Sequence, residues 1–230
     1  MERFRISACV ALLASLIVAF PIQAHAAATL TLYDGVNPLI TVVDNGPGDQ
    51  IGVTGAILVH TNVGVWNLAV STAITKPLFG SATEPVMDLD IQANSTAAGS
   101  LRLVFSDSDF GPASGILNAT VTGQSTGAGT TVTYDVYGDP APGNAIGALT
   151  DHIASAGTTP LPTLATGSGP LGLATPFSLT QVETFVASGP TSLISDASFN
   201  VTPVPEPTGM SLTGLGLAAC LLRVLRRNRS

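Results

Sequence analysis

The feature of this 230-residue sequence that most restricts its fold is a recurring alternation of apolar and polar residues. Between 131 and 136, for example, Val, Tyr and Val alternate with Thr, Thr and Asp, and similar patterns occur at 66–70, 86–91 and 101–106. Successive side chains of a strand point to opposite faces, so this period of two predicts strands with one buried face. No window keeps the apolar period of an amphipathic helix.

Further strands are expected where β-branched and apolar residues lie between turn-forming clusters of Gly, Pro, Asn and Asp. About ten short strands at this spacing predict an all-β fold, an antiparallel β-sandwich of jelly-roll type. Residues 140–175 are rich in Pro, Gly, Ser and Thr, and we expect a long loop there with one helical turn near Ala148–Ala154. The further expected strands are Thr29–Tyr33, Leu39–Val43, Ile51–His60, Ile116–Thr122, Phe177–Ala187 and Ile194–Val201.

The N-terminus has the three parts of a secretory signal peptide. Arg3 and Arg5 give a basic start, residues 6–20 are apolar, and Ala24-His25-Ala26 is a small-x-small cleavage site. We therefore expect residues 1–26 to form a signal helix that signal peptidase removes, and residues 27–203 to form one mature domain.

The C-terminus, residues 204–230, also has three parts. Pro205-Glu206-Pro207 is expected to be extended and exposed, because proline fixes φ and lacks an N–H group. Residues 208–222 are free of charge and predict a transmembrane helix. Basic residues after it would hold the end of that helix on the cytoplasmic side, and these are Arg223, Arg226, Arg227 and Arg229.

Val204-Pro205-Glu206-Pro207, with the apolar run and the final arginines, resembles the PEP-CTERM sorting signal of Gram-negative bacteria that make exopolysaccharide. The resemblance implies that an exosortase, a membrane cysteine protease, recognises and cuts near the motif. It implies export through the inner membrane to the cell surface or extracellular matrix, where exopolysaccharide is a partner. An ordinary C-terminal membrane anchor is the alternative. Runs such as 65–68, 103–110 and 178–182 also resemble PEP-CTERM proteins with no assigned activity.

The charge of the expected mature domain is strongly negative. Thirteen acidic residues lie between 27 and 203 against two basic ones, Lys76 and Arg102, which gives a formal charge of −11. Nucleic-acid binding needs Lys and Arg at the phosphates, so a nucleic-acid partner is excluded. Both cysteines, Cys9 and Cys220, lie in the terminal segments, so no disulfide is expected in the domain.

Four aspartates form a candidate calcium site. Asp107 and Asp109 lie two residues apart before Gly111, and Ca²⁺ takes several oxygen ligands. Asp88 and Asp90 could add oxygens if the polar face of their strand meets this loop. The alternative is a solvated turn, and no other cofactor is expected.

Two features point weakly to hydrolase chemistry. Gly123-Gln124-Ser125-Thr126-Gly127 matches G-x-S-x-G, but a strand is expected after it instead of the helix that a nucleophile elbow requires, so we predict a hairpin loop. His60 and His152 are the histidines of the mature domain, and a hydrolase would need one of them beside an Asp in a cleft.

The sequence therefore favours an exported, non-enzymatic surface or matrix protein that an exosortase sorts. A polysaccharide- or ice-binding module that uses a Thr-rich sheet face is the first alternative. A secreted hydrolase is the second.

Overall fold

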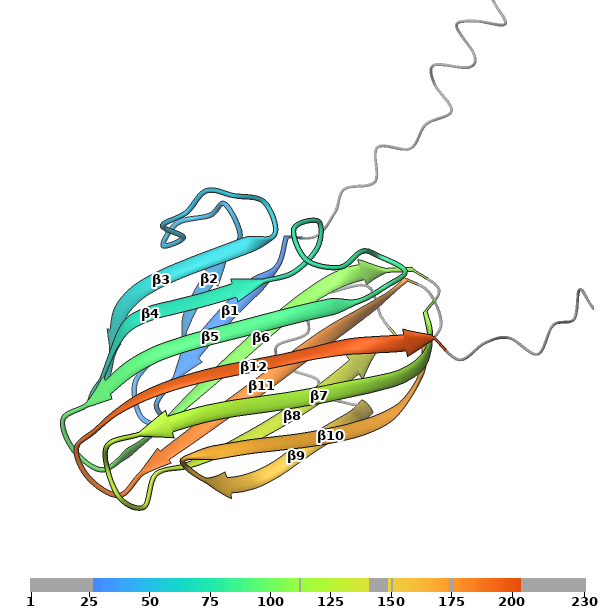
Figure 1. Ribbon diagram of the computed structural model, residues 1–230. Helices are drawn as coiled ribbons and strands as arrows, with labels where there is room; N and C mark the ends of the chain where they lie inside the picture. Colours follow the sequence, from blue (N-terminus) through green and yellow to red (C-terminus); the bar gives the residue numbers. More distant parts are fainter. Residues whose placement is uncertain (1–26, 112, 141–148, 150, 174–175, 204–230) are drawn as a thin grey trace, which may run out of the picture.

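The computed structural model of the protein describes residues 27–111, 113–140, 149, 151–173 and 176–203. Within these ranges it contains twelve strands and no helix. The strands form two six-stranded sheets that lie face to face as a sandwich (Figure 1). A search of the same ranges finds no helix with the length and apolar character needed to cross a membrane.

The first sheet, here called sheet I, is built around the long central strands β6 and β11. All its neighbouring strands pair in antiparallel fashion. Its order is β2 (Ile40–Val43), β1 (Thr29–Tyr33), β6 (Gly99–Phe110), β11 (Phe177–Ala187), β8 (Thr131–Asp139) and β9 (Asp151–Pro160).

The second sheet, sheet II, is also antiparallel throughout and has the C-terminal described strand near its centre. From β5 onward most connections cross from one sheet to the other, so strands that are neighbours in the chain mostly lie in different sheets. The order of sheet II is β10 (Thr163–Gly172), β7 (Ser114–Ser125), β12 (Thr191–Pro203), β5 (Val86–Ser95), β4 (Trp66–Ile74) and β3 (Ala56–Val63).

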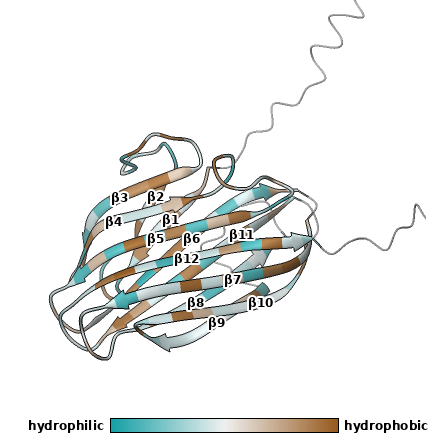
Figure 2. Cartoon of the chain, in the orientation of Figure 1, coloured by the Kyte–Doolittle hydropathy of each residue, from teal (hydrophilic) through white to brown (hydrophobic). Residues whose placement is uncertain are grey.

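The core lies between the two sheets and is supplied by alternate residues of each strand. Figure 2 shows bands of hydrophobic and hydrophilic residues alternating along the strands of sheet II. The large side chains that are fully buried come from both sheets, so the core is continuous across the sandwich. The aromatic ones among them are Trp66, Phe105, Phe110, Tyr134, Phe177, Phe185 and Phe199.

The predicted antiparallel β-sandwich is confirmed, and the expected strand at Phe177–Ala187 coincides with β11. Two details differ. The strand expected at Ile51–His60 begins at Ala56, because Gly52 and Gly55 have φ of 58° and 87° and belong to turns. In β4 the pairing register shifts between Leu68 and Val70, and beyond this shift Ser71 and Ala73 are buried.

The prediction of a loop over 140–175 is wrong for most of that segment. Residues 151–160 and 163–172 form β9 and β10, and the helical turn is absent from the described part of 148–154, which begins β9. These two strands close one side of the sandwich. A Cβ atom at Gly167 would collide with the carbonyl oxygen of Ser155, and one at Gly169 with that of Ile153. Glycine is therefore needed for the close approach of β9 and β10, and it does not mark a loop.

A polar cluster interrupts the apolar core. Tyr134, Gln181 and Glu183 are each 0% exposed. The Tyr134 hydroxyl donates to Gln181 Oε1 at 2.8 Å, and the Ser195 hydroxyl lies 2.5 Å from Glu183 Oε1. The same Ser195 oxygen lies 2.9 Å from the carbonyl oxygen of Thr122. The cluster thus joins β8 and β11 of sheet I to β12 and β7 of sheet II.

The geometry of this cluster indicates a protonated Glu183. Ser195 has one hydroxyl proton and two acceptors beside it, so it donates to only one of them. Burial raises the pKa of Glu183 to about 8, against the opposing effect of the Ser195 hydrogen bond. A neutral Glu183 carboxyl donates a hydrogen bond to the Ser195 hydroxyl. The Ser195 hydroxyl in turn donates to the carbonyl oxygen of Thr122, so both short contacts are hydrogen bonds.

This proton makes stability depend on pH. The pKa of Glu183 is about 8 in the folded state against 4.5 for an unperturbed carboxyl, so between these values the folded state binds more protons than the unfolded state. The free energy of unfolding therefore falls as the pH rises through this window. We expect Glu183→Gln, which keeps the shape without the titration, to flatten this slope and to melt several degrees above wild type at about pH 9.

Thermal melts followed by circular dichroism from about pH 5 to about pH 9 measure this difference. Glu84→Gln is the matched control, because Glu84 is exposed in the loop before β5. Parallel pH profiles for wild type and Glu183→Gln would show that Glu183 does not hold its proton in the core.

Candidate functional site

The outer face of sheet II carries a continuous groove along β12. Two adjoining depressions of about 360 and 220 Å³ share Gln92, Gln124 and Ile194, and together they extend from Asp196 to Ser192. Asp196 and Ser192 lie four residues apart on one strand, so the groove is about 13 Å long. The outward side chains of this sheet II groove come from β5, β7, β12 and the turn after β7, and they are Asp90, Gln92, Asn94, Thr122, Gln124, Thr126, Ser192, Ile194 and Asp196.

Strand pairing places these side chains in rows across the sheet. Ile194 is in register with Gln124 on one side and Gln92 on the other. Ile194 is 51% exposed, so the middle of the groove has an apolar floor between two amides. Within the part of the chain that the structure describes, the side chains of Gln92, Asn94 and Gln124 make no hydrogen bond to other residues. Their donors and acceptors are available to a ligand.

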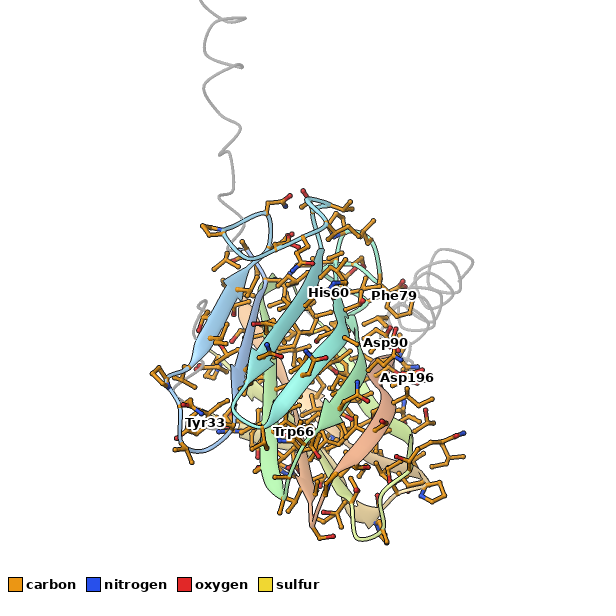
Figure 3. All side chains as sticks on the ribbon, turned by 90° about the vertical axis from the view of Figure 1, so that its left-hand side faces the viewer. Tyr33, His60, Trp66, Phe79, Asp90 and Asp196 are labelled. Carbon is orange, nitrogen blue, oxygen red and sulfur yellow. The ribbon has the colours of Figure 1, made fainter. Side chains whose placement is uncertain are left out.

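One end of the groove is acidic. Asp196 and Asp90 are direct register partners on adjacent strands, an arrangement that places like charges opposite each other. Burial raises the pKa of Asp88 to about 7, with further upward contributions from Asp90 and Asp196, and burial together with Asp196 raises the pKa of Asp90. At neutral pH the carboxyl group of Asp88, next to this end of the groove, is therefore partly protonated. Figure 3 shows Asp90 and Asp196 together on one side of the sandwich.

The structure does not bring the four predicted calcium ligands together. Asp88 and Asp90 point outward from β5, whereas Asp107 belongs to β6 of the other sheet and is 3% exposed. Asp109 lies near the end of β6 with φ of 59°. No group of three or more His, Cys, Asp or Glu side chains suited to a metal ion occurs in the described ranges. Strand alternation separates the two pairs, because the polar face of β5 points away from the sandwich.

Asp107 instead has a cation of the protein as its partner. Lys76 Nζ lies 2.7 Å from Asp107 Oδ2, donates to the carbonyl oxygen of Ser108, and sits 4.0 Å from the centre of the Phe110 ring. The Thr75 hydroxyl also donates to Asp107 Oδ2 at 2.8 Å. These contacts fix the loop after β4 against the end of β6, beside a cavity of about 690 Å³. The role of Asp107 here is structural.

The G-x-S-x-G match lies at the end of β7 and in the turn that follows. The Ser125 hydroxyl donates to the carbonyl oxygen of Gly127 at 3.1 Å, and β8 follows without a helix. The hairpin part of the prediction is wrong, because β7 and β8 lie in different sheets and this turn crosses between them. A nucleophile elbow is not formed here.

The two histidines lie apart. His152 Nε2 is 3.1 Å from Asp135 Oδ1, and the His152 ring meets Tyr137 edge-on at 5.2 Å. This pair lies on the outer face of sheet I, where the His152 side chain is 48% exposed, so the carboxylate partner is present without the enclosing cleft. His60 is exposed on β3 and accepts a hydrogen bond from Gln50 only through its backbone.

The sequence analysis missed the sheet II groove. The alternation at 86–91 indicated that Asp90 faces outward, but the row of Gln92, Ile194 and Gln124 depends on strand order, which the sequence does not show. The sorting residues Val204–Pro207, the helix predicted at 208–222, the four arginines after it and the signal segment 1–26 lie outside the described residues.

Comparisons with known proteins gave only distant structural likenesses. No family model matches the sequence, and no curated protein matches it. TmCBM61 in complex with β-1,4-galactotriose aligns with 60% of this chain and 88% of its own, at 10% identity and a TM-score of 0.33. A carbohydrate-binding module from the β-sandwich superfamily aligns with 73% of this chain and 70% of its own, at 8% identity and a TM-score of 0.35.

A third similar structure contains the CBM22-1 and GH10 modules of Clostridium thermocellum xylanase 10B with xylohexaose, at 12% identity and a TM-score of 0.28 over 64% of this chain and 28% of that one. Identities and scores this low show no more than a broad likeness among β-sandwich chains. Any function must therefore rest on the residues of this chain.

Because Asp90 and Asp196 repel each other, we expect a substitution that removes one of these charges to stabilise the protein. Asp196→Asn removes the charge opposite Asp90, and we expect the melting temperature at about pH 8 and low salt to rise by roughly 1–2 °C. The gain should shrink as NaCl is added, because salt screens exposed charges. Asp151→Asn, at an exposed position of β9, is the control for loss of one negative charge. Equal gains in both variants would show that only net charge matters.

Proposed function

We propose that the protein is an exported, non-enzymatic protein of the cell surface or extracellular matrix, and that its mature β-sandwich, of jelly-roll type, binds polysaccharide in the sheet II groove. The observation that carries this proposal is the row of exposed amides without partners, Gln92 and Gln124, on either side of Ile194. Amides present a donor and an acceptor side by side, as neighbouring sugar hydroxyls require. The apolar Ile194 suits the C–H face of a sugar ring.

The groove favours a neutral sugar chain. Its charged members, Asp90 and Asp196, are both acidic, and carboxylates accept hydrogen bonds from hydroxyl groups. A polyanion would be repelled here, because the described cations lie elsewhere: Lys76 is bound to Asp107, and Arg102 belongs to sheet I. The groove is open along β12, which allows a ligand longer than one ring to lie in it.

The two alternatives find less support. A hydrolase needs a base and a carboxylate in a cleft, whereas the His152–Asp135 pair is on an exposed surface. Ice binding was expected to use regularly spaced threonines on one flat face. Sheet I does align Thr184, Thr133 and Thr158 in register, but Arg102 and Tyr33 continue the same row and interrupt the repeat.

The terminal segments support the route that we propose for the protein. The basic, apolar and small-x-small parts of residues 1–26 fit export, and Val204–Pro207 with the following apolar and basic segments fits recognition by an exosortase. In this scheme the precursor passes the inner membrane, loses its signal peptide, and is released by the exosortase to the surface or matrix, where exopolysaccharide is its ligand.

The groove is tested by removing its amides. We expect the double variant Gln92→Ala with Gln124→Ala to lose binding to neutral polysaccharide by about 10-fold or more, because each hydrogen bond contributes about 1 kcal/mol. Affinity electrophoresis against a panel of neutral glucans, galactans, mannans and xylans measures this loss. Asn200→Ala is the control, since Asn200 lies on the same face of β12 outside the groove. Absence of binding by wild type to the whole panel would contradict the proposal.

Sorting is tested at the Pro-Glu-Pro motif. We expect Glu206→Ala to block C-terminal processing in a host that carries an exosortase, because the enzyme must read this extended segment. The intact mass of the protein from membrane and medium fractions is compared with that of wild type, and Glu84→Ala serves as the control for loss of a glutamate. Equal processing of wild type and Glu206→Ala would remove the exosortase from the scheme.

A further inference from the structure

The two cations of the described residues have different surroundings. Lys76 is fully engaged by Asp107, the Ser108 carbonyl and the Phe110 ring. Arg102, in contrast, makes no hydrogen bond, ion pair or ring contact with any side chain in the ranges that the structure describes. An arginine without a carboxylate partner is unexpected in a domain with thirteen acidic residues. Its guanidinium group presents five N–H donors in a fixed plane.

The fold places Arg102 on the outer face of sheet I. It extends from the central strand β6, and its register partners on either side are Tyr33 of β1 and Thr184 of β11. Figure 3 shows Tyr33 on the side of the sandwich opposite Asp90 and Asp196. The sheet II groove and Arg102 are therefore separated by the thickness of the core.

Arg102 lines a pocket of about 470 Å³, here called the Arg102 pocket. Tyr33 and Leu39 supply apolar and aromatic surface, and Leu39 is 58% exposed. Asn37 adds an amide to the lining, whereas Thr31 is 1% exposed and its hydroxyl is paired with that of Thr41. The pocket therefore combines one cation with the aromatic ring of Tyr33 and the amide of Asn37.

A short turn holds Asn37 in place. Asp34 accepts hydrogen bonds from the backbone N–H groups of Val36 at 3.0 Å and Asn37 at 2.7 Å, and from Asn37 Nδ2 at 2.6 Å. These bonds lower the pKa of Asp34, so it is an anion, but its oxygens are occupied within the turn and do not pair with Arg102. The amide oxygen of Asn37 is left as an acceptor for a ligand hydroxyl.

We propose that the Arg102 pocket binds the carboxylate of an acidic sugar, such as a uronate unit of a polysaccharide. The planar fork of Arg102 matches a carboxylate through two parallel hydrogen bonds. Tyr33 and Leu39 contact the ring of the sugar, and Asn37 accepts from one of its hydroxyls. The single cation suits one monoanionic group, since a densely charged polyanion would be repelled by the rest of the domain. This site goes beyond the proposed groove and lies on the other sheet.

The test is calorimetric titration of the mature domain with an otherwise neutral trisaccharide that carries one glucuronate unit, here called the acidic trisaccharide, and with the same trisaccharide after reduction of its carboxyl group. We expect the acid to bind and the reduced sugar to bind at least about 10-fold more weakly. Arg102→Gln should weaken binding of the acid by about 10- to 100-fold, and Arg102→Lys by an intermediate factor, because lysine keeps the charge without the fork. Equal affinities for the two sugars, or an unchanged affinity in Arg102→Gln, would overturn the proposal.

Further arms separate this site from a simple anion site and from the groove. Inorganic phosphate at matched ionic strength should compete weakly, and Tyr33→Ala should weaken the sugar acid without changing phosphate binding. If phosphate competes as well as the sugar acid, the pocket binds free anions and the proposal fails. The double variant Gln92→Ala with Gln124→Ala should keep full affinity for the acidic trisaccharide, whatever its effect on neutral glycans. Loss of that affinity would place the acid in the groove and overturn the assignment to Arg102.

Discussion

The alternation of side chains along strands that pack face to face decides where each polar group of this protein lies. Every second residue of the central strands enters one continuous core, and the residue between must face outward. The outer faces of the two sheets therefore receive almost all the polar groups. Among the polar residues that alternation places inside, Tyr134 is hydrogen-bonded to Gln181, and Glu183 to Ser195.

The fold also decides how an acidic chain tolerates its charges. Asp107 is neutralised by Lys76, and Glu183 is buried with a pKa raised to about 8, so it holds its proton. Asp90 and Asp196 remain as an exposed like-charge pair that contributes no stability by itself. This pair lies at the end of the groove that Gln92 and Gln124 line. Arg102 is the converse case, a cation on the opposite face that has no ion-pair partner among the described residues.

Much of the fold could be predicted from local pattern. The strand at 177–187 and the buried residues Tyr134, Met87 and Leu103 follow from alternation alone. The failures have physical reasons. Residues 151–172 were expected to belong to a loop because this part of the chain is rich in Pro, Gly, Ser and Thr, yet they form strands whose glycines permit close contact between β9 and β10. Asp107 and Asp109 were expected to bind calcium because their carboxylates lie two residues apart before a glycine, whereas the structure pairs Asp107 with Lys76 from the loop after β4.

The sequence by itself determined the period of the strands, the negative charge of the domain and the presence of only two cations in it, because each of these is a local or additive property of the chain. Only the tertiary structure decided which outward residues become neighbours. Gln92, Ile194 and Gln124 are far apart in sequence and meet because β12 lies between β5 and β7. Tyr33 and Arg102 meet because β1 pairs with β6. Such pairings depend on the order and register of strands from distant parts of the chain, which are fixed by packing over the whole core and leave no mark in any single segment.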